Sequence, residues 1–167
     1  MSPLGTLHIL LVDDNANMRE IVSTMLSALG VGRVTQAEDG YQALAMLAQT
    51  PADIAIIDYR MAPMDGVAFT RHIRHSKDSP DTELPVIMMT GHSELSRVTS
   101  ARDAGVTEFV AKPVDLYSLK KRLEAVILRP RPYIRAGDFY GPDRRRQNLP
   151  DYQGPWRRSM DMTEIDA

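Results

Sequence analysis

The chain has 167 residues and a mass of 18.7 kDa, which is enough for one ordinary domain with length to spare. It contains no cysteine, and this excludes a disulfide framework, a thiol nucleophile and a cysteine-ligated metal site. The formal net charge is −2, so the bulk charge gives no reason to expect binding to nucleic acid or to a membrane surface.

Charge and composition divide the chain into two parts. The last 39 residues, 129–167, hold eight Arg against six acidic residues, together with five of the 11 prolines and five of the ten aromatic residues. Residues 1–128 hold 12 basic residues against 16 acidic ones. We therefore expect an acidic globular body over 1–128, followed by a basic, proline-rich and aromatic tail over 129–167.

The apolar segments are too short to cross a membrane. No stretch approaches the ~20 apolar residues of a membrane helix. The first apolar run, Leu7–Val12, stops at two aspartates and has no basic region before it, unlike a signal peptide. These features, with the absence of cysteine, predict a protein of the cytoplasm.

Short apolar runs rich in Val and Ile recur through the body. They predict parallel strands, because strands that are buried on both faces are nearly continuous in hydrophobic residues. The predicted strands are Leu7–Val12, Val34–Ala37, Ile54–Ile57, Val86–Met89 and Glu108–Ala111.

Helical patterns lie between these strands. Residues 18–29 and 116–127 carry clear apolar stripes with helical spacing, and the remaining three segments are compatible with helices. Those three segments are 41–49, 66–75 and 94–104. Five repeated strand–helix units predict an α/β domain with a parallel sheet and right-handed crossovers.

Polar residues directly follow the apolar runs. Asp13 and Asp14 follow the first predicted strand, and Asp58 follows the third. Thr90 follows the fourth, and Lys112 follows the fifth. In an open α/β sheet, ligands bind at the carboxyl ends of the strands, where the strand order reverses. If the order is 2-1-3-4-5, these five side chains converge there.

The chemistry of this group indicates a phosphoryl site. Three close carboxylates raise one another's pKa unless a cation joins them, and oxygen ligands suit a hard ion such as Mg²⁺. A metal, a lysine and a hydroxyl neutralise charge on transferring oxygens, and an aspartate can become an aspartyl phosphate. Taken singly, Asp13 or Asp14 could cap the next helix and Lys112 could be a solvated charge. Chance alone would rarely place all five groups at the ends of the correct strands, so we interpret them as one site.

The motifs resemble the receiver domain of bacterial two-component response regulators, of the stand-alone, chemotaxis-regulator-like type. The resemblance covers roughly residues 5–128 and implies a doubly wound, flavodoxin-like (βα)5 sheet of order 2-1-3-4-5. The motifs that carry it are Val12-Asp13-Asp14-Asn15, Asp58 with Met61 and Met64-Asp65-Gly66, Thr90-Gly91, and Lys112-Pro113.

The resemblance also implies a role for each site residue. Asp58 would accept a phosphoryl group from a phosphohistidine on a sensor histidine kinase or a histidine phosphotransfer protein. Asp14, Asp58 and the backbone carbonyl of Arg60 would bind Mg²⁺ directly, and Asp13 would act mostly through water. Lys112 would pair with a phosphoryl oxygen.

A conformational switch is implied in the same way. Thr90 would swing toward the phosphate, and Phe109 would rotate into the space that it leaves. The surface that reports this change would be the face made by the helix near 94–104, the strand 108–111 and the last helix.

The tail begins with Arg129-Pro130-Arg131-Pro132, which ends the last helix and favours an extended segment. The remaining residues are too few, and too poor in aliphatic side chains, for a separate output domain, and they show no helix-turn-helix pattern. We therefore expect no DNA-binding domain and an irregular tail.

The tail contains a duplicated motif, Asp-aromatic-x-Gly-Pro-x-Arg-Arg, with copies at 138–145 and 151–158. Its Gly-Pro pairs predict turns that present an aromatic side chain and two guanidinium groups, the residue types that dominate binding hot spots. The residues that we single out are Tyr140, Gly141, Pro142, Arg144 and Arg145 in the first copy, and Tyr152, Gly154, Pro155, Arg157 and Arg158 in the second.

Four interpretations of the tail remain open. We favour packing against the body or a neighbouring protomer, followed by a pair of docking motifs for a protein partner. A weak arm for nucleic acid or membrane is disfavoured, because acidic residues are interspersed with the arginines. The fourth interpretation is a disordered extension.

The sequence therefore predicts a single-domain response regulator that is phosphorylated on Asp58 and signals through protein contacts, rather than an enzyme. A phosphorelay intermediate would use the same residues. A phosphohydrolase with an aspartyl-phosphate intermediate is disfavoured, because its second aspartate would stand where this chain has Arg60. The sequence does not identify the cognate kinase, the process controlled or the oligomeric state, for which a homodimer is one alternative.

Overall fold

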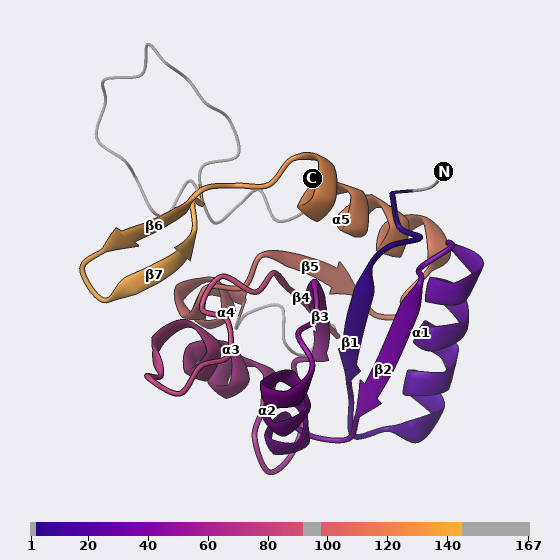
Figure 1. Cartoon of the computed structure of the whole chain (residues 1–167), viewed down its shortest axis with the longest axis horizontal. Helices are drawn as coiled ribbons and strands as arrows, with labels where there is room; N and C mark the ends of the chain where they lie inside the picture. Colours follow the sequence, from indigo (N-terminus) through magenta and orange to yellow (C-terminus); the bar gives the residue numbers. More distant parts are fainter. Residues whose placement is uncertain (1–2, 92–97, 145–167) are drawn as a thin grey trace.

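A computed structural model describes residues 3–91 and 98–144. The body alternates strands and helices as the sequence predicts (Figure 1). Its elements are β1 (His8–Val12), α1 (Ala16–Ala28), β2 (Arg33–Ala37), α2 (Gly40–Gln49), β3 (Ile54–Asp58), α3 (Gly66–His75), β4 (Val86–Thr90), α4 (Val98–Ala104), β5 (Glu108–Ala111) and α5 (Leu116–Leu128). Residues 94–97 of the predicted fourth helix lie outside the described part of the chain.

The five strands form one parallel sheet of order β2-β1-β3-β4-β5, which confirms the predicted fold class. Two apolar clusters cover its two faces. Side chains of α2, α3 and α4 pack on one face, and side chains of α1 and α5 pack on the other. Strands β3 and β4 are buried along their whole length, which is why their sequences are nearly continuous in apolar residues.

Polar side chains fix where four of the helices begin. In each case the capping side chain accepts a hydrogen bond from a backbone N–H three residues further on. The caps are Asn15 for α1, Asp39 for α2, Asp65 for α3 and Asp115 for α5. Because Asn15 caps α1, that role does not fall to Asp13 or Asp14.

Within the described part of the tail, the chain forms a β-hairpin instead of an irregular segment. Strands β6 (Tyr133–Ala136) and β7 (Phe139–Pro142) pair antiparallel, and the chain reverses at Gly137, whose φ is +61°. The predicted turn at Gly141-Pro142 is wrong, because both residues lie in β7. Glycine at position 137 suits the left-handed backbone conformation that this reversal requires.

The hairpin packs back on the body, as the favoured interpretation of the tail expects, and contacts α3 and α4 (Figure 1). Arg131, just before β6, donates hydrogen bonds to the carbonyl of Thr107 and to that of Asp143, the latter at 3.0 Å. Arg145 and the whole second copy of the motif lie outside the described residues. Among the described helices, none is long and apolar enough to span a membrane.

Candidate functional site

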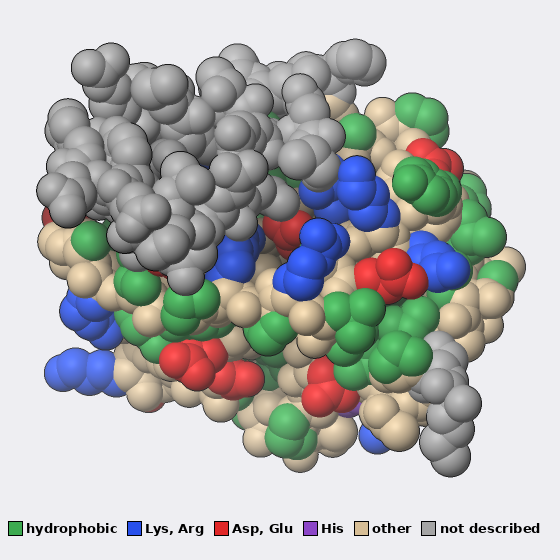
Figure 2. Space-filling view, turned by 90° about the horizontal axis from the view of Figure 1, so that it is seen from above, with side chains coloured by type: hydrophobic (Ala, Val, Ile, Leu, Met, Phe, Trp, Pro, Cys, Tyr) green, Lys and Arg blue, Asp and Glu red, His purple; other side chains and the backbone are tan. Residues whose placement is uncertain are grey.

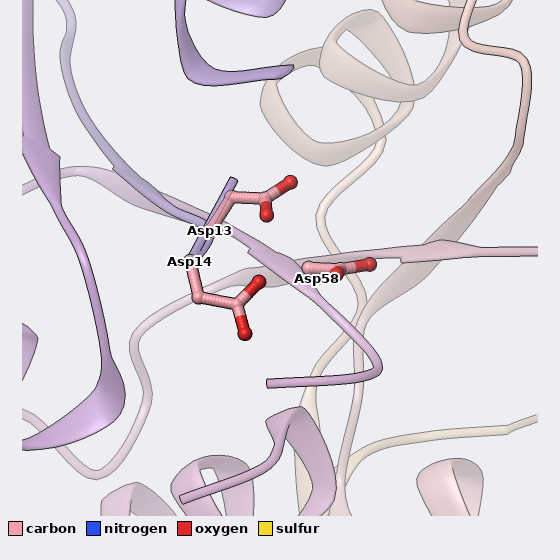
Figure 3. A group of neighbouring side chains, drawn as sticks. All are labelled: Asp13, Asp14 and Asp58. Atoms are coloured by element: carbon pink, nitrogen blue, oxygen red, sulfur yellow. The ribbon is translucent and has the colours of Figure 1, made fainter. Parts of the chain in front are cut away.

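Three carboxylates meet at the carboxyl edge of the sheet. Asp13 and Asp14 follow β1, and Asp58 is the last residue of β3, the neighbouring strand. One oxygen from each carboxylate lies within 4.8 Å of the other two. Figure 3 shows the three side chains projecting to the same side of this edge. The topological switch point between β1 and β3 thus brings together the acidic residues that the sequence placed at these strand ends.

Asp13 is buried, with only 1% of its surface exposed. Burial, and after it the charges of Asp58 and Asp14, raise its pKa, although a hydrogen bond from the backbone N–H of Asn15 at 2.9 Å acts in the opposite direction. Its Oδ2 is buried and accepts no hydrogen bond from the described residues. The site therefore holds a buried carboxylate oxygen to which none of the described residues donates a hydrogen bond.

A lysine balances part of this charge. Lys112, directly after β5, places its Nζ 2.5 Å from Oδ1 of Asp58. The backbone N–H of Lys112 donates to the carbonyl of Thr90 at 2.7 Å, which joins the ends of β4 and β5. Thr90 is 3% exposed. The five side chains that the sequence singled out therefore stand on adjacent strand ends.

The donor set fits a hard divalent cation. All three acidic groups offer oxygen, and among the described residues one ammonium group, that of Lys112, pairs with Asp58. An additional positive charge would offset their repulsion and would give Oδ2 of Asp13 a partner, directly or through water. Mg²⁺ prefers this combination of carboxylates and water to a closed protein cage.

The end of β3 also restricts which residue can stand at position 66. A Cβ on Gly66 would lie 2.6 Å from the carbonyl oxygen of Asp58. Only glycine allows the first turn of α3 to approach the strand end so closely. Arg60, which lies between Asp58 and Gly66 in the sequence, is exposed.

Phe109 lies in β5, three residues before Lys112, and is 6% exposed. It lines a small hollow with Arg102 of α4 and with Arg131, Pro142 and Arg144 of the tail. The described tail therefore borders the residue that the resemblance implies as a switch.

Sequence reasoning missed a second group of charges at the opposite end of β5. Glu108 is 3% exposed, and its carboxylate lies 3.9 Å from Arg122 of α5 and 3.4 Å from Arg131 of the tail. The sequence offered one signal for this group, a glutamate at the start of an apolar strand. Such a buried acid requires a basic partner.

We expect the Asp13→Asn variant to be more stable than the wild type when metal is absent. The substitution removes a buried charge that lies beside two other carboxylates, so the free energy of unfolding should rise by about 1 kcal/mol and the melting temperature by about 3 °C. Saturating Mg²⁺ should stabilise the wild type more than the variant. Thermal melts with and without Mg²⁺ measure both effects. Equal Mg²⁺-induced shifts in the melting temperatures of the two proteins would contradict a role of Asp13 in a metal site.

The family model of the response regulator receiver domain matches residues 9–124. The chain belongs to this family. The curated relatives that it resembles include the chemotaxis protein CheY-3 of Vibrio cholerae, with 34% identity over 74% of this chain and 93% of the relative. Another is the chemotaxis protein CheY of Pseudomonas aeruginosa, with 34% identity over 74% of this chain and 98% of the relative.

Solved receiver structures have the same fold. A putative response regulator of Chloroflexus aurantiacus superposes with a TM-score of 0.68 at 25% identity, covering 74% of this chain and 98% of that one. A receiver domain of a Pseudomonas aeruginosa sensor histidine kinase gives a TM-score of 0.62 at 30% identity, covering 71% and 94%. That crystal structure has a magnesium ion coordinated in its active-site cleft.

Proposed function

We propose that this receiver domain accepts a phosphoryl group on Asp58 from a phosphohistidine donor and works as a stand-alone response regulator in the cytoplasm. The observation that carries the proposal is the Asp58–Lys112 pair at 2.5 Å inside a group of three carboxylates. The donor would be a sensor histidine kinase or a histidine phosphotransfer protein. In this assignment residues 1–128 form the receiver domain, and residues 129–167 are an added tail.

Each site residue has a chemical task in this transfer. A carboxylate oxygen of Asp58 attacks the phosphorus, so that an O–P bond forms as the N–P bond of the donor histidine breaks. The Lys112 ammonium neutralises charge on a phosphoryl oxygen, and the Thr90 hydroxyl donates a hydrogen bond to another. Both groups already stand at strand ends next to the acceptor.

The metal site is part of the proposal. Asp14, Asp58 and the backbone carbonyl of Arg60 would hold Mg²⁺, with Asp13 acting mostly through water. When bound, Mg²⁺ supplies positive charge that offsets the charge of the phosphoryl oxygens. The clustered carboxylate oxygens and the magnesium-bound receiver domain of P. aeruginosa support this assignment.

Output would pass through protein contacts. Thr90 and Phe109 are the proposed switch residues, and α4, β5 and α5 form the proposed readout face. The hairpin borders this face, so a downstream partner would meet the tail as well as the helices. Figure 2 looks down on the side that carries α5, where basic and acidic side chains alternate among hydrophobic ones. Exposed apolar side chains on this helix include Leu116, Tyr117 and Leu128.

A relay intermediate remains the second candidate, because a phosphoryl group on Asp58 could pass to another histidine through the same residues. Phosphate lifetime and back-transfer distinguish the two functions. A phosphohydrolase needs a second acid or base near the acceptor to activate water. Arg60 stands two residues after Asp58 in place of such a group.

Labelling with acetyl phosphate tests the proposal. We expect one phosphoryl group per chain in the presence of Mg²⁺ and no detectable labelling after chelation of the metal. Reduction of the aspartyl phosphate with borohydride, followed by peptide mass spectrometry, should place the modification at position 58. Modification at Asp13 or Asp14, or equal labelling in the presence of a chelator, would contradict the proposal.

A further inference from the structure

The first copy of the tail motif is held on the body by a close contact between two backbones. Gly141 of β7 lies against Gly105, which follows α4 and has a φ of +101°. A Cβ on Gly141 would lie 2.9 Å from the Cα of Gly105. A Cβ on Gly105 would lie 2.9 Å from the carbonyl oxygen of Tyr140. The contact therefore requires glycine in the motif and glycine on the body.

Side chains of the motif add to this contact. Arg144 places Nη2 2.7 Å from Oδ1 of Asp103 on α4, and its guanidinium lies 4.2 Å from the ring centroid of Phe139. Pro142 is buried and lines the hollow beside Phe109. We call the body surface made by Asp103, Gly105 and the residues between 102 and 109 that line this hollow the Gly105 site.

Four of the residues that form these contacts are repeated in the second copy. The first copy uses an aromatic residue, a glycine, a proline and an arginine at the same positions that the second copy repeats 13 residues later. The contacting residues of the first copy are Phe139, Gly141, Pro142 and Arg144, and their counterparts are Tyr152, Gly154, Pro155 and Arg157. The second copy thus repeats these four residues, whereas Tyr140, whose hydroxyl donates to Glu83 at 3.2 Å, is replaced by Gln153.

We propose that the second copy is an alternative ligand of the Gly105 site of its own chain, and that the two copies exchange on this site. The proposal does not depend on phosphorylation of Asp58. In the exchanged state the second copy takes the place of β7 beside β6. The sole tryptophan, Trp156, then stands at the position of Asp143, which is 8% exposed in the structure.

Loop length decides which copy predominates. Two residues, 137 and 138, connect β6 to β7, whereas 15 residues, 137–151, would connect β6 to the second copy. The longer connection disfavours the second copy by about 20-fold when the contacts are otherwise equal. The same tether gives the second copy an effective concentration on the order of millimolar, which exceeds that of a separate molecule in dilute solution.

Fluorescence of Trp156 tests the exchange in the full-length chain. The Gly141→Val variant places a side chain against Gly105 and expels the first copy. We expect its Trp156 emission to shift to shorter wavelength and its acrylamide quenching to fall by about half, as occupancy passes to the second copy. Adding Gly154→Val should restore wild-type quenching. Arg144→Glu, which opposes Asp103 without altering the backbone, should repeat the effect of Gly141→Val.

The control is Gly137→Asn in the hairpin turn, where a Cβ meets nothing within 4 Å and asparagine tolerates the positive φ. It should leave Trp156 unchanged. The exchange is overturned if Gly141→Val and Arg144→Glu leave the quenching at the wild-type level, or if Gly154→Val has no effect on their quenching. Quenching that falls only as protein concentration rises would assign the second copy to another molecule and would overturn exchange within one chain.

Discussion

The Asp58→Asn variant should take up no phosphoryl group from acetyl phosphate, even with saturating Mg²⁺. The amide that replaces the carboxylate lacks the nucleophilic oxygen, and it also removes the partner of Lys112 at 2.5 Å. Asp13 and Asp14 retain their carboxylates, but among the described residues the ion pair of Lys112 is with Asp58. We therefore expect loss of labelling to the detection limit, measured by intact-protein mass spectrometry.

Asp78→Asn is the matched control, because Asp78 is an exposed aspartate on the loop after α3. This variant should be labelled like the wild type. Both variants should give the same far-UV circular dichroism, which separates a chemical effect from loss of fold. Labelling of Asp58→Asn at wild-type stoichiometry would show that another residue accepts the phosphoryl group.

Arg74→Ala should cause a large loss of stability, because it removes a buried side chain that joins α3 to the tail. Arg74 is only 2% exposed, and burial lowers its pKa. Its guanidinium donates two hydrogen bonds to the carbonyl of Gly105, at 3.1 and 2.9 Å, and one to that of Thr82 at 3.0 Å. It also lies 5.0 Å from the ring centroid of Tyr133 in β6.

Truncation would leave two carbonyls without their donor and would create a cavity under the hairpin. We expect the free energy of unfolding to fall by about 3 kcal/mol, measured by urea denaturation. Arg71→Ala, an exposed position on the same helix, should change it by less than about 0.5 kcal/mol. A loss below about 1 kcal/mol for Arg74→Ala would mean that other groups satisfy the carbonyl of Gly105.

The sequence predicted the sheet and the acidic site because both leave local signals. Buried parallel strands are continuous apolar runs, and the polar residues that end them, such as Asp58 and Lys112, fall on one edge once the strand order is known. The order itself followed from the resemblance and is confirmed by the structure. The expected helices leave a similarly local signal, the spacing of their apolar residues.

The tail was predicted less well because its conformation depends on distant residues. Gly141-Pro142 is typical of a turn, but the body offers Gly105 as a close neighbour, and the pair becomes part of a strand instead. The role of Arg74 also could not be predicted, since its partners lie 31 residues away at Gly105 and in the tail at Tyr133. Contacts between segments so far apart have no periodic signature in one sequence.

Helix α3 connects the two regions that this chain combines. Its first residue, Gly66, abuts the carbonyl of the proposed acceptor, and Arg74 near its other end holds Gly105 and contacts Tyr133. The two positions are separated by about 12 Å of α-helix, a stiff rod over this length. We therefore expect a displacement of the Asp58 backbone to reach the base of the hairpin along this helix without crossing the sheet.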